Sequence, residues 1–145
     1  MTEFLHCRKV SSDSLIKLEE NGKKAIFRNQ NRLNHHVYKI DGCVIDEGER
    51  ADFLVNSPDG HSVILELKGC NVEKACRQIY STLSHPNMKT MLQSKIGLLI
   101  VCSAVRMPRA DTFIQKQKQK FAKEFNALLH VKCKKAEVDC PSLTL

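Results

Sequence analysis

Apolar residues alternate with polar ones in several short segments that predict strands. Residues 36–45 are strand-like with a break at Asp41-Gly42, and residues 51–55 and 62–68 follow as two further strands. Residues 56–60 read Asn-Ser-Pro-Asp-Gly, and these turn-forming residues predict a hairpin loop. The middle of the chain therefore predicts three consecutive strands, of which the last two form a hairpin.

Helical spacing replaces this alternation after residue 70. Asn71 is the expected N-cap of a helix whose buried stripe is formed by Val72, Ala75, Cys76, Ile79 and Leu83. Residues 96–102 form a continuous apolar run, which is typical of a strand buried on both faces. A second helix is expected over residues 109–129, and residues 130–133 are compatible with a last edge strand.

The N-terminal region has a weaker pattern. Ser12 or Asp13 as a cap, apolar residues at 15, 16 and 18, and a stop at Asn21-Gly22 predict a short helix over residues 12–22. Residues 23–35 give no clear pattern. The expected order is α-β-β-β-α-β-α with an optional last strand, which favours an α/β fold with one mixed sheet and helices on its faces. We expect a single domain over residues 1–145.

The composition narrows the classes of partner. The formal net charge is +7 and the pI is about 9.1, which favours anionic partners such as nucleic acid, although a basic surface without a partner explains the charge equally well. Tryptophan is absent and aromatics make up 6% of the chain, which disfavours an aromatic stacking platform for single strands. No apolar run is long enough to span a membrane.

The cysteines indicate a reducing environment. They number seven, none forms a C-x2-C pair, and several lie in apolar runs as small hydrophobic residues. Because the number is odd and no signal peptide is apparent, we expect a cytoplasmic location and no structural zinc site.

Candidate chemistry is concentrated on the third strand and its neighbour. Alternate residues of a strand share a face, so Glu66 and Lys68 point the same way. Asp52 lies thirteen residues before Glu66, on the preceding strand, so the hairpin is expected to bring the two carboxylates within a residue or two of each other. Adjacent carboxylates repel, and Mg²⁺ binds through one or two such groups together with phosphate oxygens.

This arrangement resembles the PD-(D/E)xK nuclease superfamily, in which an Asp, a hairpin, a Glu-x-Lys strand end and a helix follow one another. The matching segments are residues 50–55 and 64–69, and the resemblance covers residues 36–102. It implies a restriction-endonuclease-like αβββαβ core and metal-dependent phosphodiester hydrolysis. Asp52, Glu66 and the backbone carbonyl of Leu67 would hold Mg²⁺ or, in its place, Mn²⁺, and Lys68 would assist the attacking water.

The sequence departs from the superfamily pattern at three places. Ala51 stands where many members have proline. Members that add an acid from the first helix suggest Glu19 or Glu20 for this role, and we favour Glu20. Gln78 matches a site glutamine of some members, but Thr82 replaces the tyrosine of the Gln-x-x-x-Tyr pattern, which argues against a RecB-type exonuclease.

Simpler interpretations remain open for each residue. Asp52 and Lys68 could form an exposed cross-strand ion pair that contributes about 0–1 kcal/mol. Glu20 and Gln78 could be ordinary surface residues. The lysine-rich segment with Lys116, Lys118 and Lys120 could bind phosphates or could be a solvated helix face.

The leading hypothesis is a Mg²⁺-dependent endonuclease. Superfamily membership would favour DNA over RNA as its substrate. Because no recognition domain is evident, specificity would come from loops, a homodimer or a partner protein. The alternatives are a nucleic-acid-binding or protein-interaction module that has lost catalysis, and an interaction protein that is basic for unrelated reasons.

Overall fold

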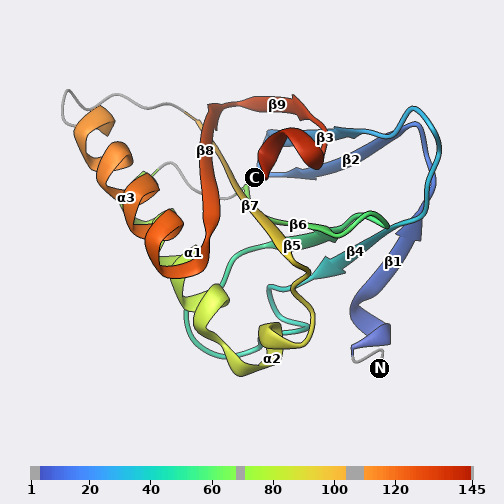
Figure 1. The fold of residues 1–145 in the computed structure, drawn as a ribbon, viewed down its shortest axis with the longest axis horizontal. Coiled ribbons are helices and arrows are strands. Elements are labelled where there is room, and N and C mark those ends of the chain that lie inside the picture. The colour runs from blue at the N-terminus through green and yellow to red at the C-terminus, as the bar shows by residue number, and fades with distance from the viewer. Residues whose placement is uncertain (1–3, 68–70, 104–109, 145) are drawn as a thin grey trace.

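The computed structural model describes residues 4–67, 71–103 and 110–144, which form a mixed α/β fold (Figure 1). Six strands make the main sheet, in the spatial order β1 (Arg8–Ser11), β4 (His35–Lys39), β5 (Phe53–Asn56), β6 (His61–Glu66), β7 (Lys95–Cys102) and β8 (Ala127–Cys133). A second sheet contains β2 (Leu15–Glu20), β3 (Lys23–Arg28) and β9 (Lys135–Val138). The helices are α1 (Val72–Ser84), α2 (Pro86–Lys89) and α3 (Ala110–Phe125), with short 3₁₀ turns η1 (Leu5–Cys7) and η2 (Pro141–Leu143).

The main sheet is mixed, as the sequence predicted. Strands β1, β4, β5 and β6 pair antiparallel, whereas β6, β7 and β8 pair parallel. Helix α1 crosses from β6 to β7, and α3 crosses from β7 to β8. The β5–β6 hairpin, the buried β7 strand and the edge position of β8 are confirmed. The Asn71 side chain accepts a hydrogen bond from the Lys74 backbone N–H at 3.1 Å, which confirms the predicted cap.

The predicted helix over residues 12–22 is wrong, because this segment contains β2. Ile16 is buried while Leu15 is 43% exposed, which is a strand alternation with its apolar face on the core. Asn21-Gly22, predicted as the end of that helix, is instead the turn that joins β2 to β3 in a hairpin, and both residues have positive φ. Strand β9 returns from the C-terminal region to pair parallel with β3.

The two faces of the main sheet are covered differently. Residues of α1 and α3 share one core cluster with Leu54, Ile64 and Leu98. The second sheet covers the opposite face, where Phe27 and Val138 share a cluster with Leu65. The expected mixed sheet flanked by helices is therefore present, and the described helices pack in the cluster of one face while the second sheet covers the other.

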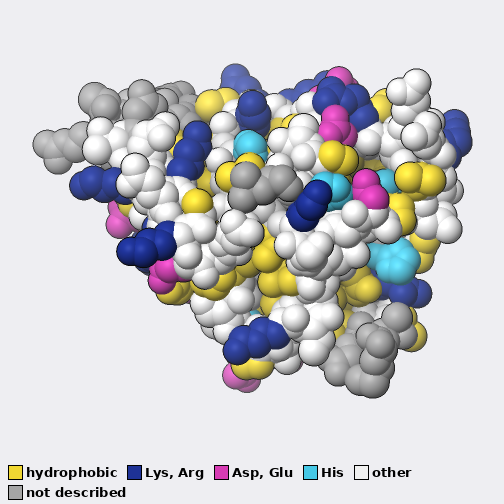
Figure 2. Space-filling model, viewed as in Figure 1, with side chains coloured by type: hydrophobic (Ala, Val, Ile, Leu, Met, Phe, Trp, Pro, Cys, Tyr) yellow, Lys and Arg dark blue, Asp and Glu magenta, His cyan; other side chains and the backbone are white. Residues whose placement is uncertain are grey.

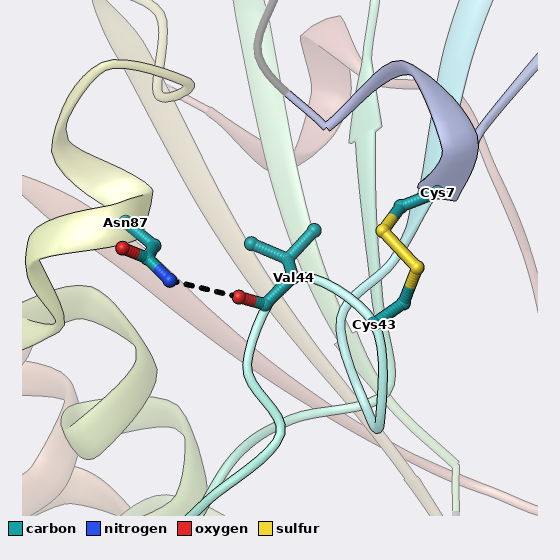
Figure 3. The surroundings of a disulfide bond; sticks show 4 residues. All are labelled: Cys7, Cys43, Val44 and Asn87. Atoms are coloured by element: carbon teal, nitrogen blue, oxygen red, sulfur yellow. Dashed lines mark hydrogen bonds between the residues drawn. A yellow bond between two sulfur atoms is a disulfide. The ribbon is translucent and has the colours of Figure 1, made fainter.

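A disulfide between Cys7 and Cys43 ties the N-terminal turn η1 to the loop after β4 (Figure 3). The same loop is held from the other side by α2, because Asn87 Nδ2 donates a hydrogen bond to the Val44 carbonyl at 3.0 Å. The interpretation of the cysteines as reduced, small hydrophobic residues did not include this bond. It does hold for Cys76, Cys102 and Cys140, which are buried thiols. None of the described helices combines the length and apolar character required to cross a lipid bilayer.

Candidate active site

Asp52 and Glu66 lie next to the last paired residues of the β5–β6 hairpin. The strand register pairs Phe53 with Leu65; Asp52 directly precedes Phe53, and Glu66 directly follows Leu65. This register agrees with the expectation that the two residues come within a residue or two of being cross-strand neighbours. The role of the two carboxylates as a metal site stays a prediction.

Backbone hydrogen bonds fix the position of Asp52 at the point where β5 begins. Its N–H donates to the Leu65 carbonyl at 3.1 Å, and its carbonyl accepts from the N–H groups of Ile40 and Asp41 at 2.9 and 3.3 Å. Its carboxylate Oδ2 accepts the Leu67 N–H at 2.7 Å. The Asp52 carboxylate thus accepts a backbone N–H that a carbonyl of the neighbouring strand would accept in a regular sheet. This hydrogen bond holds the carboxylate at the end of β6.

Both carboxylates lie inside the protein. Asp52 is 2% exposed, and Glu66 is fully buried with both carboxylate oxygens enclosed. Buried charges are costly unless they are paired, hydrogen-bonded or bound to a cation. The interpretation of Asp52 as a solvated surface residue is therefore wrong. Two enclosed carboxylates form a donor set that suits Mg²⁺ or Mn²⁺.

Lys68 and Leu67 are the two remaining residues of the predicted motif. Lys68 lies outside the described residues, so its expected role is not tested. Leu67 is buried and contacts the site through its N–H, which binds Asp52. The role of its carbonyl as a metal ligand stays a prediction.

Helix α1 anchors the segment that leads into Asp52. Gln78 Nε2 donates to the Arg50 carbonyl at 3.3 Å, and Thr82 Oγ1 accepts the Ala51 N–H at 2.8 Å. These contacts make Gln78 a positioning residue for the entry to β5 and give no evidence of contact with a reacting group. The sequence interpretation missed Thr82, because it considered that position only as the place of an absent tyrosine.

The candidate acids of the expected first helix lie instead on β2. Glu19 is exposed and forms an ion pair with Lys24 at 3.4 Å. Glu20 is half-buried, with its Oε2 enclosed, and it is the cross-strand partner of Lys23. Its assignment to a helix is wrong, and its participation in the site stays a prediction.

The carboxyl ends of β6, β7 and β8 meet at the edge of the sheet where the carboxylate pair lies. In the strand register, Glu66 is the Cα partner of Ile100 of β7, and Ile100 is the Cα partner of Val131 of β8. Open sheets of this kind bind ligands beyond the carboxyl ends of their parallel strands. Burial raises the pKa of the Cys102 thiol at this edge to about 11. The Cys102 carbonyl accepts the Lys134 N–H at 2.7 Å, and the Lys134 carbonyl accepts the Lys24 N–H at 3.1 Å, so the start of β3 lies close by.

The predicted phosphate-binding lysines lie on α3. Lys116 and Lys120 are exposed, and Lys118 is half-exposed. The Lys120 ammonium lies 4.4 Å from the centre of the Tyr80 ring of α1, which is a cation–π contact. These lysines are accessible to an anionic partner, and their role in binding one stays a prediction.

A separate group of possible metal ligands consists of His6, Cys7 and Cys43, whose ligand atoms lie within 4.8 Å of one another. In this structure the two sulfur atoms are bonded to each other. Metal ligation by cysteine requires the thiolate, so the oxidised pair does not provide a site.

Comparison of the chain with protein-family models, with curated proteins and with solved structures finds no match. The geometry of the site therefore carries the functional interpretation.

Proposed function

We propose that the protein is a Mg²⁺-dependent nuclease of the PD-(D/E)xK type that hydrolyses phosphodiester bonds. The observation that carries this proposal is the buried Asp52–Glu66 pair at the carboxyl edge of the main sheet. The order of β4, β5, β6, α1 and β7 also follows the restriction-endonuclease-like pattern, with β2 and β3 in place of the first helix.

Each residue of the site would have a separate role in hydrolysis. Asp52, Glu66 and the Leu67 carbonyl would hold Mg²⁺, which supplies Lewis-acid activation of the phosphodiester and of water. Lys68 would orient the attacking water or stabilise the developing negative charge. The Leu67 N–H fixes one oxygen of Asp52, so this carboxylate has little orientational freedom. Gln78 and Thr82 hold the backbone just before it.

We extend the proposal to the partners of the protein. DNA is proposed as the substrate because of the resemblance to DNA-cutting nucleases and the basic net charge. A homodimer would provide one site for each strand of a duplex, and a partner protein could supply specificity.

One observation favours a second candidate, a nucleic-acid-binding module without catalysis. Glu66 is fully buried, so a metal and a phosphate reach it only if the covering residues move. A site that stays closed would leave the carboxylates with a purely structural role.

Cleavage of supercoiled plasmid in Mg²⁺ separates the two candidates. We expect nicking that EDTA abolishes and that Glu66→Gln reduces by roughly 100-fold or more, because ligand-sphere changes have effects of about this size. The matched control is Glu47→Gln, which changes an exposed glutamate of the loop before β5 and should leave the rate unchanged. Intact plasmid, branched DNA and RNA with every variant would contradict the nuclease proposal.

A further inference from the structure

Lysine side chains gather where β8 turns into β9. Lys132, Lys134 and Lys135 occur within four successive positions, and all three are exposed. None of them forms an ion pair with another residue that the structure describes. Figure 2 shows several Lys and Arg side chains along the upper margin of the molecule, over the region where Figure 1 places β8 and β9. Uncompensated like charges repel one another and attract anions.

The backbone of this corner is held firmly in an unusual conformation. Lys134 has a φ of 63°, in the left-handed region that residues other than glycine seldom adopt. Its N–H donates to the Cys102 carbonyl of β7 at 2.7 Å, and its carbonyl accepts from the Lys24 N–H of β3 at 3.1 Å. Lys134 therefore bridges the two sheets through its main chain while its side chain projects into solvent.

The neighbouring strand β3 adds positive charge beside the corner. Lys24 is the Cα partner of Lys135, its N–H donates to the Lys134 carbonyl at 3.1 Å, and Lys23 directly precedes it. The acids on the same strands are Glu19, which pairs with Lys24, Glu20, which is the cross-strand partner of Lys23, and Glu137, which pairs with Arg28. Five lysines thus stand against three glutamates, one of which pairs with an arginine. We call Lys23, Lys24, Lys132, Lys134 and Lys135 the basic corner.

The basic corner lies at the same edge of the main sheet as the carboxylate pair. In the strand register, Glu66 is aligned with Ile100 and Ile100 with Val131, and Lys132 is the next residue toward the carboxyl edge. The corner adjoins the face that the second sheet covers, because Val101, the Cα partner of Lys132, belongs to that face, whereas Ile100 belongs to the helix face. Strand spacing of about 4.8 Å and a rise of about 3.3 Å per residue place the Cα atom of Lys132 about 10 Å from that of Glu66. Phosphates of one strand of a duplex follow one another every 3.4 Å or so along its axis, so this separation spans about three nucleotides.

We propose that the basic corner is the surface on which the phosphate backbone of duplex DNA docks, next to the strand segment at the carboxylate pair. This inference rests on the proposed nucleic-acid function and assigns the contact to β8, β9 and β3 in place of α3. The hydrogen bonds of the Lys134 backbone fix the main chain of this corner before binding, so the loss of entropy on association is confined to the lysine side chains.

The test measures how salt affects binding of a short fluorescein-labelled DNA duplex, by anisotropy in Ca²⁺ to avoid cleavage. Each phosphate contact contributes about 0.9 to the slope of log K against log salt. Lys132→Glu/Lys134→Glu should therefore lower the affinity and reduce the slope by about 1.8. The matched control is Lys89→Glu/Lys95→Glu, which makes the same charge change at exposed positions on α2 and at the amino end of β7. It should retain the wild-type slope.

Two further variants complete the test. Lys116→Glu/Lys118→Glu examines α3, and Lys132→Gln/Lys135→Gln examines the corner without changing Lys134, in case its conformation does not tolerate glutamate. A slope that falls equally in the Lys89/Lys95 control, or only in the α3 variant, would overturn the proposal. An unchanged slope in both corner variants would also overturn it.

Failure of this inference is distinguishable from failure of the proposed nuclease. The wild-type protein could cleave no substrate while the corner variants show a reduced salt dependence of DNA binding. This result would support the basic corner and contradict the nuclease proposal. Glu66-dependent cleavage of plasmid, together with corner variants that bind the DNA duplex with the wild-type salt dependence, would support the nuclease proposal and contradict the proposed role of the basic corner.

Discussion

Thr82 shows how one side chain can secure the approach to a site. It is fully buried, its Oγ1 accepts the Ala51 N–H at 2.8 Å, and the same hydroxyl donates to the Gln78 carbonyl at 2.7 Å. Ala51 is itself buried and directly precedes Asp52. The hydroxyl thus joins α1 to the start of β5 through a backbone group that water does not reach.

We predict that Thr82→Val lowers the free energy of unfolding by about 1–3 kcal/mol, because it leaves the buried Ala51 N–H without its acceptor. The measurement is urea denaturation, with Thr112→Val as the control, since Thr112 is an exposed residue of α3. Equal free energies of unfolding for the two variants would show that this hydrogen bond does not stabilise the fold by the predicted amount.

The positions of Asp52 and Glu66 could be predicted at the residue scale because the hairpin is local. The turn residues 56–60 and the alternation on both strands fix the register, and the structure agrees with it. The contacts of Thr82 and Gln78 could not be predicted, because they depend on how α1 docks against a segment about thirty residues earlier.

At the scale of elements, long-range pairing explains why the N-terminal prediction failed. Apolar residues at 15, 16 and 18 fit a helix and a strand almost equally well over so short a segment. The strand is chosen by its partners, because β2 pairs with β3 and β3 pairs in parallel with β9 from the other end of the chain. In contrast, α1 and β7 carry strong local signals in their cap and apolar run, and both were predicted.

The disulfide is also an element-scale feature, since it joins η1 to the loop between β4 and β5. The two cysteines are 36 residues apart, and closing a loop of this length is expected to stabilise the fold by about 3–4 kcal/mol through the unfolded state. We predict a loss of this size for Cys7→Ser/Cys43→Ser in urea denaturation without reductant.

The control for this prediction is Cys133→Ser, which changes an exposed thiol and should have little effect. Addition of reductant should bring the wild-type protein to the stability of the double variant. A wild-type protein whose stability does not respond to reductant would contradict the prediction.

At the scale of the whole molecule, the carboxyl edge of the main sheet brings together the residues of the two proposals. Glu66, Cys102 and Cys133 end three adjacent parallel strands, and Lys134 and Lys135 of the basic corner follow the last of them. The crossovers through α1 and α3 could be predicted from the order of elements. The basic corner could not, because it forms only when β9 carries the C-terminal region across to β3.

The central claim is that Asp52 and Glu66 bind a divalent cation, and thermal unfolding in EDTA and in Mn²⁺ tests it most directly. A ligand present at about 100 times its dissociation constant stabilises a folded protein by about 2.7 kcal/mol. We predict that Mn²⁺ raises the melting temperature of the wild-type protein and of Glu47→Gln, and that Glu66→Gln loses this rise. Equal responses in all three proteins, or no response in any, would contradict the account.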